Sequence, residues 1–131
     1  MRLAGNGLIV KDKKILLLKR NFHTKAFPGY WTVPGGRQEK GETAEQTAIR
    51  EVKEESNLDF VPTQLFHTNF TVNSGENIHS HRYLGEFSGE IKIQEKEATD
   101  YGWFTYEETL TLEIAFDYAD VFKKLREEKY L

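Results

Sequence analysis

Three glutamates, Glu51, Glu54 and Glu55, stand close together in the sequence. On a helix, residues three and four apart are neighbours with Cβ atoms about 5–6 Å apart, and like charges at that distance repel. A divalent cation would offset the repulsion, because Mg²⁺ binds carboxylate oxygens and completes its octahedral shell with water and substrate phosphate. A solvated acidic surface, screened by Arg50 and Lys53, is the alternative that the helix alone leaves open.

The surrounding segment, Ala44–Ser56, has the pattern of a helix that would position these glutamates. Thr43 and Gln46 form a capping box at its start. Asn57 tolerates the left-handed conformation that ends a helix. At about 100° per residue, the three carboxylates lie within roughly 100° of the helix surface, beside an apolar side. The apolar side is predicted to comprise Ala44, Ala48, Ile49 and Val52.

The spacing upstream of the helix is specific. Gly36 is followed after five residues by Glu42, and Glu42 after seven by Arg50-Glu51-Val52-Lys53-Glu54-Glu55. This pattern resembles the Nudix box, a Gly and a Glu before a helix that carries Arg-Glu-aliphatic-x-Glu-Glu and ends in Gly-aliphatic. Every defining position matches except one, where Asn57 replaces a helix-ending Gly. The resemblance to the Nudix hydrolase family (MutT-like) favours the metal site over the acidic surface.

The resemblance extends from the strands expected after Gly7 to the last helix, and it implies one Nudix domain over residues 1–131. The implied fold is an α/β/α sandwich with a mixed central sheet, and strands interspersed with two helices independently predict the α/β class. The implied activity is Mg²⁺-dependent hydrolysis of a phosphoanhydride bond in a nucleoside diphosphate derivative, with Mn²⁺ as the alternative ion.

The family pattern also implies roles for the residues of the box. Glu51, Glu54 and Glu55 would form the metal cluster, with Glu51 or a metal-bound hydroxide as the candidate base. Arg50 is expected to hold the glutamates by a bidentate pair, because a guanidinium fits a carboxylate and has no useful proton to give. Glu42 would be a supporting ligand or hydrogen-bond acceptor.

Two further metal ligands are suggested by the resemblance. In similar proteins the carbonyl of the residue that matches Gly35 binds the metal, although a simple tight turn explains Gly35 and Gly36 equally well. An acidic residue in a loop before a Trp is also common in the family. Glu97, six residues before Trp103, fits this spacing, and Glu95 is its rival.

The candidate substrate contacts are aromatic and basic residues. Phe27, Tyr30 and Phe70 are candidates to stack on a base, with a place in the core as the alternative. Arg20 and Arg82 are candidates to reach phosphates, with a solvated surface as the alternative for each.

His79 and His81 would point to one side of a strand. No third ligand stands at helical or strand spacing from them, so the pair is only a weak indication of a metal site. We interpret them as partly exposed strand residues or substrate contacts.

The rest of the sequence predicts short strands and one further helix. Apolar stretches at 7–10 and 15–18 flank a polar turn, and stretches at 64–72 and 79–87 predict a hairpin joined by 73–77. Other predicted elements are a loop at 21–30, strands at 31–33, 89–93 and 102–105, and a helix at 115–129.

The composition of the chain excludes several classes of function. The chain has no cysteine, which excludes a thiolate nucleophile and disulfides, and its net charge of −3 argues against binding a nucleic-acid polymer. No apolar run predicts a secretory signal or membrane span, so we expect a cytoplasmic protein with a small nucleotide as its partner.

We favour a nucleoside triphosphate pyrophosphohydrolase, because the sequence shows no added N-terminal dimerisation segment of the kind that larger nucleotide-sugar relatives often carry. Nucleotide sugars and dinucleoside polyphosphates remain open as substrates. A non-catalytic nucleotide-binding sensor and an acidic interaction domain are the alternatives from other classes. Monomer and homodimer are equally open.

Overall fold

The structure is a computed structural model that describes residues 1–73 and 75–131, and these residues form two compact units. The first unit contains residues 1–8 and 34–92, and the second contains residues 9–33 and 93–131. Each unit has its own four-stranded sheet. Each is described by itself below.

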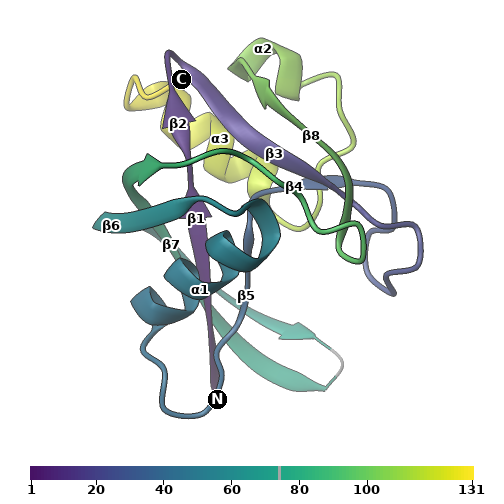
Figure 1. Cartoon of the computed structure of the whole chain (residues 1–131), viewed down its shortest axis with the longest axis vertical. Helices are drawn as coiled ribbons and strands as arrows, with labels where there is room; N and C mark the ends of the chain where they lie inside the picture. The colour runs from purple at the N-terminus through teal and green to yellow at the C-terminus, as the bar shows by residue number, and fades with distance from the viewer. Residues whose placement is uncertain (74) are drawn as a thin grey trace. The chain divides into compact units, whose positions relative to one another are not determined.

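The sheet of the first unit is mixed, as the sequence predicts for the fold (Figure 1). Its order is β5-β1-β7-β6, with β1 parallel to β7 and the other neighbours antiparallel. The strands are β1 (Arg2–Leu8), β5 (Gly35–Arg37), β6 (Asp59–Asn73) and β7 (Glu76–Ser88). β6 and β7 form the predicted hairpin, longer at both ends than expected, and Ser74 in its turn lies outside the described residues.

Helix α1 (Ala44–Ser56) has the predicted bounds. The side chain of Thr43 accepts a hydrogen bond from the backbone N–H of Gln46, and the side chain of Gln46 accepts one from Thr43, which completes the capping box. At the other end Asn57 is left-handed, with φ 68°, and its N–H donates to the carbonyl of Lys53. The signals that were used to place the helix ends are confirmed.

α1 packs directly on β1, which Figure 1 shows crossing behind the helix. A Cβ at Gly5 would lie 2.2 Å from the carbonyl oxygen of Ala44 and 2.6 Å from the nitrogen of Ala48, so only a glycine permits this approach. The prediction of Ile49 on the buried side is wrong, since it is 41% exposed and Thr47 is fully buried instead. Burial of Thr47 is possible because its hydroxyl donates to the carbonyl of Thr43.

The sheet of the second unit is antiparallel, with β3 at its centre paired to three other strands. The strands are β2 (Val10–Lys11), β3 (Lys14–Arg20), β4 (Trp31–Thr32) and β8 (Ala98–Phe104). Asp12 and Lys13, both with positive φ, form the two-residue turn between β2 and β3, which is the backbone geometry that hairpins favour. The polar turn predicted there is confirmed.

Two helices belong to the second unit. α3 (Tyr118–Glu127) is the predicted last helix, starting three residues later than expected, and it buries Tyr118, Val121, Phe122 and Leu125. α2 (Tyr106–Thr109) was not predicted, although Thr105 and Glu108 form a capping box that marks its start. Within residues 1–73 and 75–131, no helix has the length and apolar character needed to cross a membrane.

The strand predicted at 89–93 is wrong. β7 ends at Ser88, and Gly89 has φ 101°, a conformation that breaks an extended strand. The segment after it instead follows the end of α1, where the side chain of Asn57 donates to the carbonyl of Glu90 and the N–H of Lys92 donates to the carbonyl of Ser56.

Candidate active site

The centre of the candidate site is an ion pair between Arg50, on α1, and Glu42, in the segment before it. Nε of Arg50 donates to Oε2 of Glu42 at 2.7 Å and Nη2 donates to Oε1 at 3.0 Å, so the pair is bidentate. Both side chains are largely shielded from solvent, with exposed fractions of 20% and 18%. The single proton of the Thr47 hydroxyl is shared between the carbonyl of Thr43 and Glu42, each 3.0 Å away. The sequence predicted that Arg50 forms a bidentate pair. The structure identifies its partner as Glu42, which lies outside the helix.

This pairing sets the charge of Glu42. The hydrogen bond from Arg50, followed by one from the backbone N–H of Glu39, lowers the pKa of Glu42 from 4.5 to about 2. Conversely, the carboxylates raise the pKa of Arg50 above its ordinary value. Glu42 is therefore ionised at neutral pH and acts as a fixed hydrogen-bond acceptor.

Arg50 also holds two of the helix carboxylates. Nη1 donates to Glu51 at 2.8 Å and to Glu54 at 3.1 Å, while Nη2 donates to the carbonyl of Arg37 at 3.1 Å. Glu51 is 14% exposed and Glu54 is 49% exposed. One guanidinium thus donates hydrogen bonds to three carboxylates from two segments and lies 3.6 Å from a fourth, that of Glu39. These contacts offset the repulsion expected between neighbouring glutamates.

Glu55 is held from the other side of the cluster, by β5. The backbone N–H of Gly35 donates to Oε2 of Glu55 at 2.7 Å. A carboxylate oxygen of Glu55 lies within 4.8 Å of one of Glu51. Two oxygens bound to one Mg²⁺ at about 2.0–2.1 Å would lie about 3–4 Å apart, so a small adjustment brings both onto one ion.

Gly36 makes room for the Glu51 carboxylate. A Cβ at Gly36 would lie 2.6–2.8 Å from the carboxylate atoms of Glu51, so a side chain here would displace that carboxylate. The sequence alone left a simple tight turn as an equal explanation for Gly36, and this close approach now gives a specific one. The oxygen-only donors and the cradle formed by Gly36 fit a hard divalent cation.

Two neighbours of the site were missed from the sequence. Asn6 is paired with Gly35 across β1 and β5, and a Cβ at Gly35 would lie 1.9 Å from its Nδ2 atom. Thr47 donates to Glu42 from the buried side of α1. The strand pairing that places Asn6 has no local sequence signal, whereas Thr47 follows Thr43 by four residues and so lies on the same side of the helix.

Three predicted substrate residues lie in the second unit. Phe27 and Tyr30 have ring centres 5.4 Å apart, and Phe27 packs at 4.8 Å on Phe116, which was not predicted. Arg20 lies over the Phe116 ring at 5.1 Å and donates to the carbonyl of Ala26. Phe27 is 37% exposed, so the core alternative is wrong for it. The cluster presents partly exposed aromatic rings beside a cation.

Tyr30 has a specific partner in this cluster. A hydrogen bond with Glu113, together with the negative charge of Glu113, raises the pKa of the Tyr30 hydroxyl. The hydroxyl proton of Tyr30 is thus held in the hydrogen bond with Glu113.

The other two predicted substrate residues lie in the first unit. Phe70 is 63% exposed and stacks on His79, with ring centres 3.8 Å apart, so the core alternative is wrong for Phe70 too. Arg82 is only 3% exposed, and its Nη1 lies 3.1 Å from Nδ1 of His67. The solvated-surface alternative is therefore wrong for Arg82, whose place on an inner strand buries it.

Glu97 lies in the second unit, just before β8. Its N–H donates to the carbonyl of Gln94 at 2.9 Å, and its own carbonyl accepts from the N–H of Asn21 at 3.1 Å. Glu95 is on the same turn, and its carbonyl accepts from the side chain of Asn21. These contacts fix the backbone of both glutamates, and the choice between them as a metal ligand stays a prediction.

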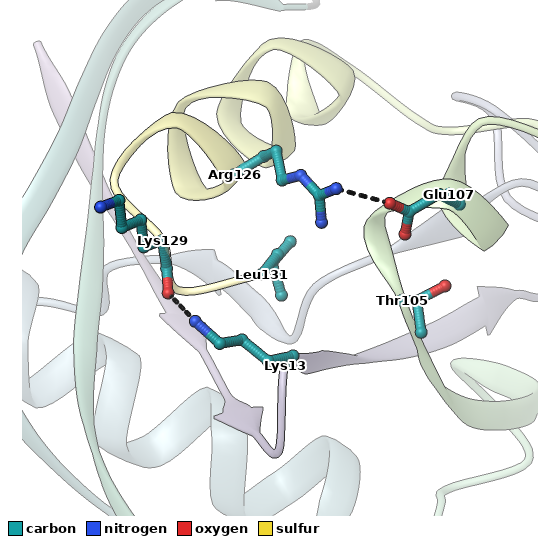
Figure 2. Close-up of a pocket in the computed structure, with 6 residues that line it drawn as sticks. All are labelled: Lys13, Thr105, Glu107, Arg126, Lys129 and Leu131. Atoms are coloured by element: carbon teal, nitrogen blue, oxygen red, sulfur yellow. Dashed lines mark hydrogen bonds and ion pairs between the residues drawn. The ribbon is translucent and has the colours of Figure 1, made fainter.

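A pocket of about 390 Å³ is also present in the second unit (Figure 2). Arg126 pairs with Glu107 at 2.7 Å across it, and the Lys13 ammonium donates to the carbonyl of Lys129. It is lined by Lys13, Thr105, Glu107, Arg126, Lys129 and Leu131. None of these was predicted as a site residue, and the pocket shares no residue with the carboxylate site.

Comparison with known proteins decides the family. The model of the NUDIX domain matches residues 1–125. The chain belongs to the NUDIX family. The resemblance of its sequence to the Nudix box is confirmed.

Curated proteins related to this NUDIX chain include enzymes with different substrates. The ADP-ribose pyrophosphatase of Methanocaldococcus jannaschii is 48% identical over 56 residues, which are 43% of this chain and 32% of that protein. The NAD-capped RNA hydrolase NudC of Pectobacterium carotovorum is 36% identical over 106 residues, 76% of this chain and 37% of that protein. The chain thus matches about a third of the length of these relatives.

Solved NUDIX structures match nearly the whole chain. The MutT protein of Methanosarcina mazei Go1 superposes with a TM-score of 0.84 at 25% identity, covering 98% of this chain and 95% of that one. The MutT NUDIX hydrolase of Burkholderia pseudomallei gives 0.81 at 25% identity, covering 94% and 95%. The Nudix-type α/β fold with a mixed sheet, expected from the sequence, is confirmed.

Proposed function

We propose that this chain is a Mg²⁺-dependent pyrophosphohydrolase that cleaves a phosphoanhydride bond in nucleoside diphosphate derivatives. The observation that carries the proposal is that Arg50 donates hydrogen bonds to three carboxylates in a chain of the NUDIX family. An acidic surface with no function needs no such organisation, since charge runs on a surface are normally solvated one by one. The alternative of an acidic interaction domain therefore loses its support.

The proposed metal ligands are the carboxylates of Glu51, Glu54 and Glu55 and the carbonyl of Gly35. When bound, a divalent ion neutralises phosphate oxygens and lowers the pKa of water at the site. Mg²⁺ suits an all-oxygen donor set, and Mn²⁺ is the alternative. The family resemblance adds Glu97, with Glu95 as its rival, and Glu97→Gln compared with Glu95→Gln would separate the two by their Mg²⁺ requirement.

The side chains of Arg50 and Glu51 are proposed to orient the metal ligands and to accept a proton from water. Arg50 fixes the orientations of Glu42, Glu51 and Glu54 and holds no proton that it can give up at neutral pH. Glu51, 14% exposed and held against Gly36, is our candidate for accepting the proton of the attacking water. A fixed carboxylate next to the reacting water loses little entropy on the way to the transition state.

For the substrate we favour nucleoside triphosphates, with nucleotide sugars and dinucleoside polyphosphates as alternatives. The exposed rings of Phe27 and Phe70, together with Tyr30, are proposed to stack on the base, and Arg20 to contact phosphate. Arg82, buried beside His67, is left out of this set. The named relatives are an ADP-ribose pyrophosphatase and an NAD-capped RNA hydrolase, so compounds with an ADP portion belong in the comparison.

We further propose a single domain over residues 1–131 that works in the cytoplasm on a small molecule, as a monomer or homodimer. The net charge of −3 supports a small substrate over a polymer, because a polymer would need a surplus of cations on one face.

The test is a panel of nucleotides with Mg²⁺ and identification of the products. It should contain the nucleoside triphosphates, ADP-ribose, NAD, a nucleotide sugar and a dinucleoside tetraphosphate. We expect release of pyrophosphate from a triphosphate, of two monophosphates from a diphosphate-linked substrate, or of two nucleotides that share the four phosphates of a dinucleoside tetraphosphate. Binding without turnover on every compound would support the sensor instead, and neither binding nor turnover would reject a nucleotide function.

A further inference from the structure

Two histidines of β7 face each other outside the carboxylate site. His79 and His81 are two apart on the strand, so they share one face of the sheet. Nδ1 of His79 lies 3.3 Å from Nε2 of His81, with the ring planes at 88°. The proposed hydrolysis uses neither residue.

Each ring is held by a neighbour. Phe70, opposite on β6, stacks on His79 with ring centres 3.8 Å apart and an angle of 9°. Nδ1 of His81 lies 3.4 Å from the hydroxyl of Tyr83. When that Nδ1 donates to Tyr83, the lone pair of His81 lies on Nε2, the atom that faces His79. Both rings are therefore oriented before any ligand arrives.

The separation of the two nitrogens allows two states. With the proton of His79 on Nδ1, the contact is an N–H···N hydrogen bond. With that proton on Nε2 of His79 instead, the lone pairs of both nitrogens are available to a cation. Two nitrogens bound to one tetrahedral Zn²⁺ at about 2.0–2.1 Å each lie about 3.3–3.4 Å apart. The observed 3.3 Å already matches that separation.

The donor type of the pair determines which metal ions suit it. A metal binds only neutral imidazole. Imidazole nitrogen suits Zn²⁺, Cu²⁺ and Ni²⁺, whereas the oxygen donors of α1 suit Mg²⁺.

We propose that His79 and His81 form a two-imidazole chelate for a divalent transition metal such as Zn²⁺, completed by water. Phe70 and Tyr83 act as positioning residues for the two rings. The site is separate from the Mg²⁺ ligands and does not depend on the proposed hydrolase activity. The two imidazoles are fewer protein ligands than the three or four of most zinc sites, so water has to fill the remaining positions.

The experiment is calorimetric titration of Zn²⁺ into the protein in excess Mg²⁺, which occupies the carboxylate site. The variants are His79→Asn and His81→Asn, and His23→Asn is the matched control that removes an exposed histidine of the second unit. We expect one Zn²⁺ per chain in wild type and in His23→Asn. Either strand variant should bind at least about tenfold more weakly, the scale on which losses at metal sites are measured.

Equal Zn²⁺ affinity in all four proteins, or no binding by wild type, would overturn the proposal. Circular dichroism without metal checks that the variants fold. A second measurement needs no variant: the electron paramagnetic resonance spectrum of Cu²⁺ bound to wild type in excess Mg²⁺ should show coupling to imidazole nitrogens. A spectrum with oxygen ligands alone would overturn the site.

Discussion

Arg50 binds Glu42 through two hydrogen bonds, although Glu42 lies eight residues earlier and outside the helix that carries Arg50. The same guanidinium reaches Glu51 and Glu54. Glu42 is therefore the anchor that fixes Arg50, and Arg50 fixes the carboxylates that we propose as metal ligands. These contacts explain physically why Glu42 and the helix glutamates stand at fixed distances from Arg50 in the sequence.

Replacing Arg50 by lysine should impair the metal site while preserving the charge. An ammonium is a point donor and lacks the planar fork that contacts Glu42, Glu51 and Glu54 together. We expect kcat to fall by about 10–100-fold and the Mg²⁺ requirement to rise, the range found for residues that orient metal ligands. Arg126→Lys, at the surface pair with Glu107, is the control and should match wild type. An unchanged Mg²⁺ requirement in Arg50→Lys would contradict this role.

Glu42 should make the folded protein sensitive to acid. Its pKa is lowered from 4.5 to about 2 in the fold, so its contribution to stability is complete above about pH 4.5 and is lost as the pH falls towards 2. The free energy of unfolding in urea should therefore differ most between wild type and Glu42→Gln at neutral pH, and the difference should shrink below pH 4.5. Glu45→Gln, on the exposed first turn of α1, serves as the control. A difference that stays constant down to pH 3 would argue against the pairing.

Gly36→Ala should separate activity from stability. The added Cβ would lie 2.6–2.8 Å from the Glu51 carboxylate, which sits at the end of a flexible side chain and can move aside. We expect a melting temperature close to wild type but a loss of activity of about tenfold or more, because displaced metal ligands are costly. Gly102→Ala, which crowds the ring of Phe104 in the second unit, controls for a methyl group added to a strand glycine. Full activity in Gly36→Ala would show that the position of Glu51 does not matter.

Asn57 should affect stability more than chemistry. It ends α1 at φ 68°, and its side chain donates to the carbonyl of Glu90. Alanine pays the full penalty of the left-handed conformation, so Asn57→Ala should lose about 1 kcal/mol of unfolding free energy. Asn57→Gly should remain closer to wild type, because freedom at φ offsets the lost hydrogen bond. Equal urea midpoints for the two variants would count against this explanation.

The parts of the fold that the sequence predicts are those governed by local interactions. α1 was predicted to the residue because Thr43, Gln46 and Asn57 carry the signals for its ends. Ile49 was placed wrongly because the hydrophobicity of a side chain does not reveal which side of a helix meets the sheet. That side is decided by Gly5 on β1, which allows the helix to approach.

The same distinction holds for the site. The choice of the α1 carboxylates as site residues follows from their spacing in the sequence. The contacts of Arg50 with Glu42 and of Gly35 with Glu55 join separate segments and could not be predicted in this way. The false strand at 89–93 also reflects a non-local effect, since this segment is bound to the end of α1. Sequence patterns therefore identify the chemical groups, and tertiary contacts determine their partners.

The central claim is that the carboxylates of α1 hold the catalytic metal. Its most direct test is Mg²⁺-dependent turnover of the best nucleotide substrate by Glu54→Gln and Glu55→Gln, with Glu45→Gln on the same helix as the matched control. Since metal stabilisation of a transition state amounts to several kcal/mol, we predict that kcat falls about 100-fold or more in both variants. Mg²⁺ should also raise the melting temperature less in Glu55→Gln than in wild type. Undiminished turnover in both variants, with equal Mg²⁺ shifts, would contradict the claim.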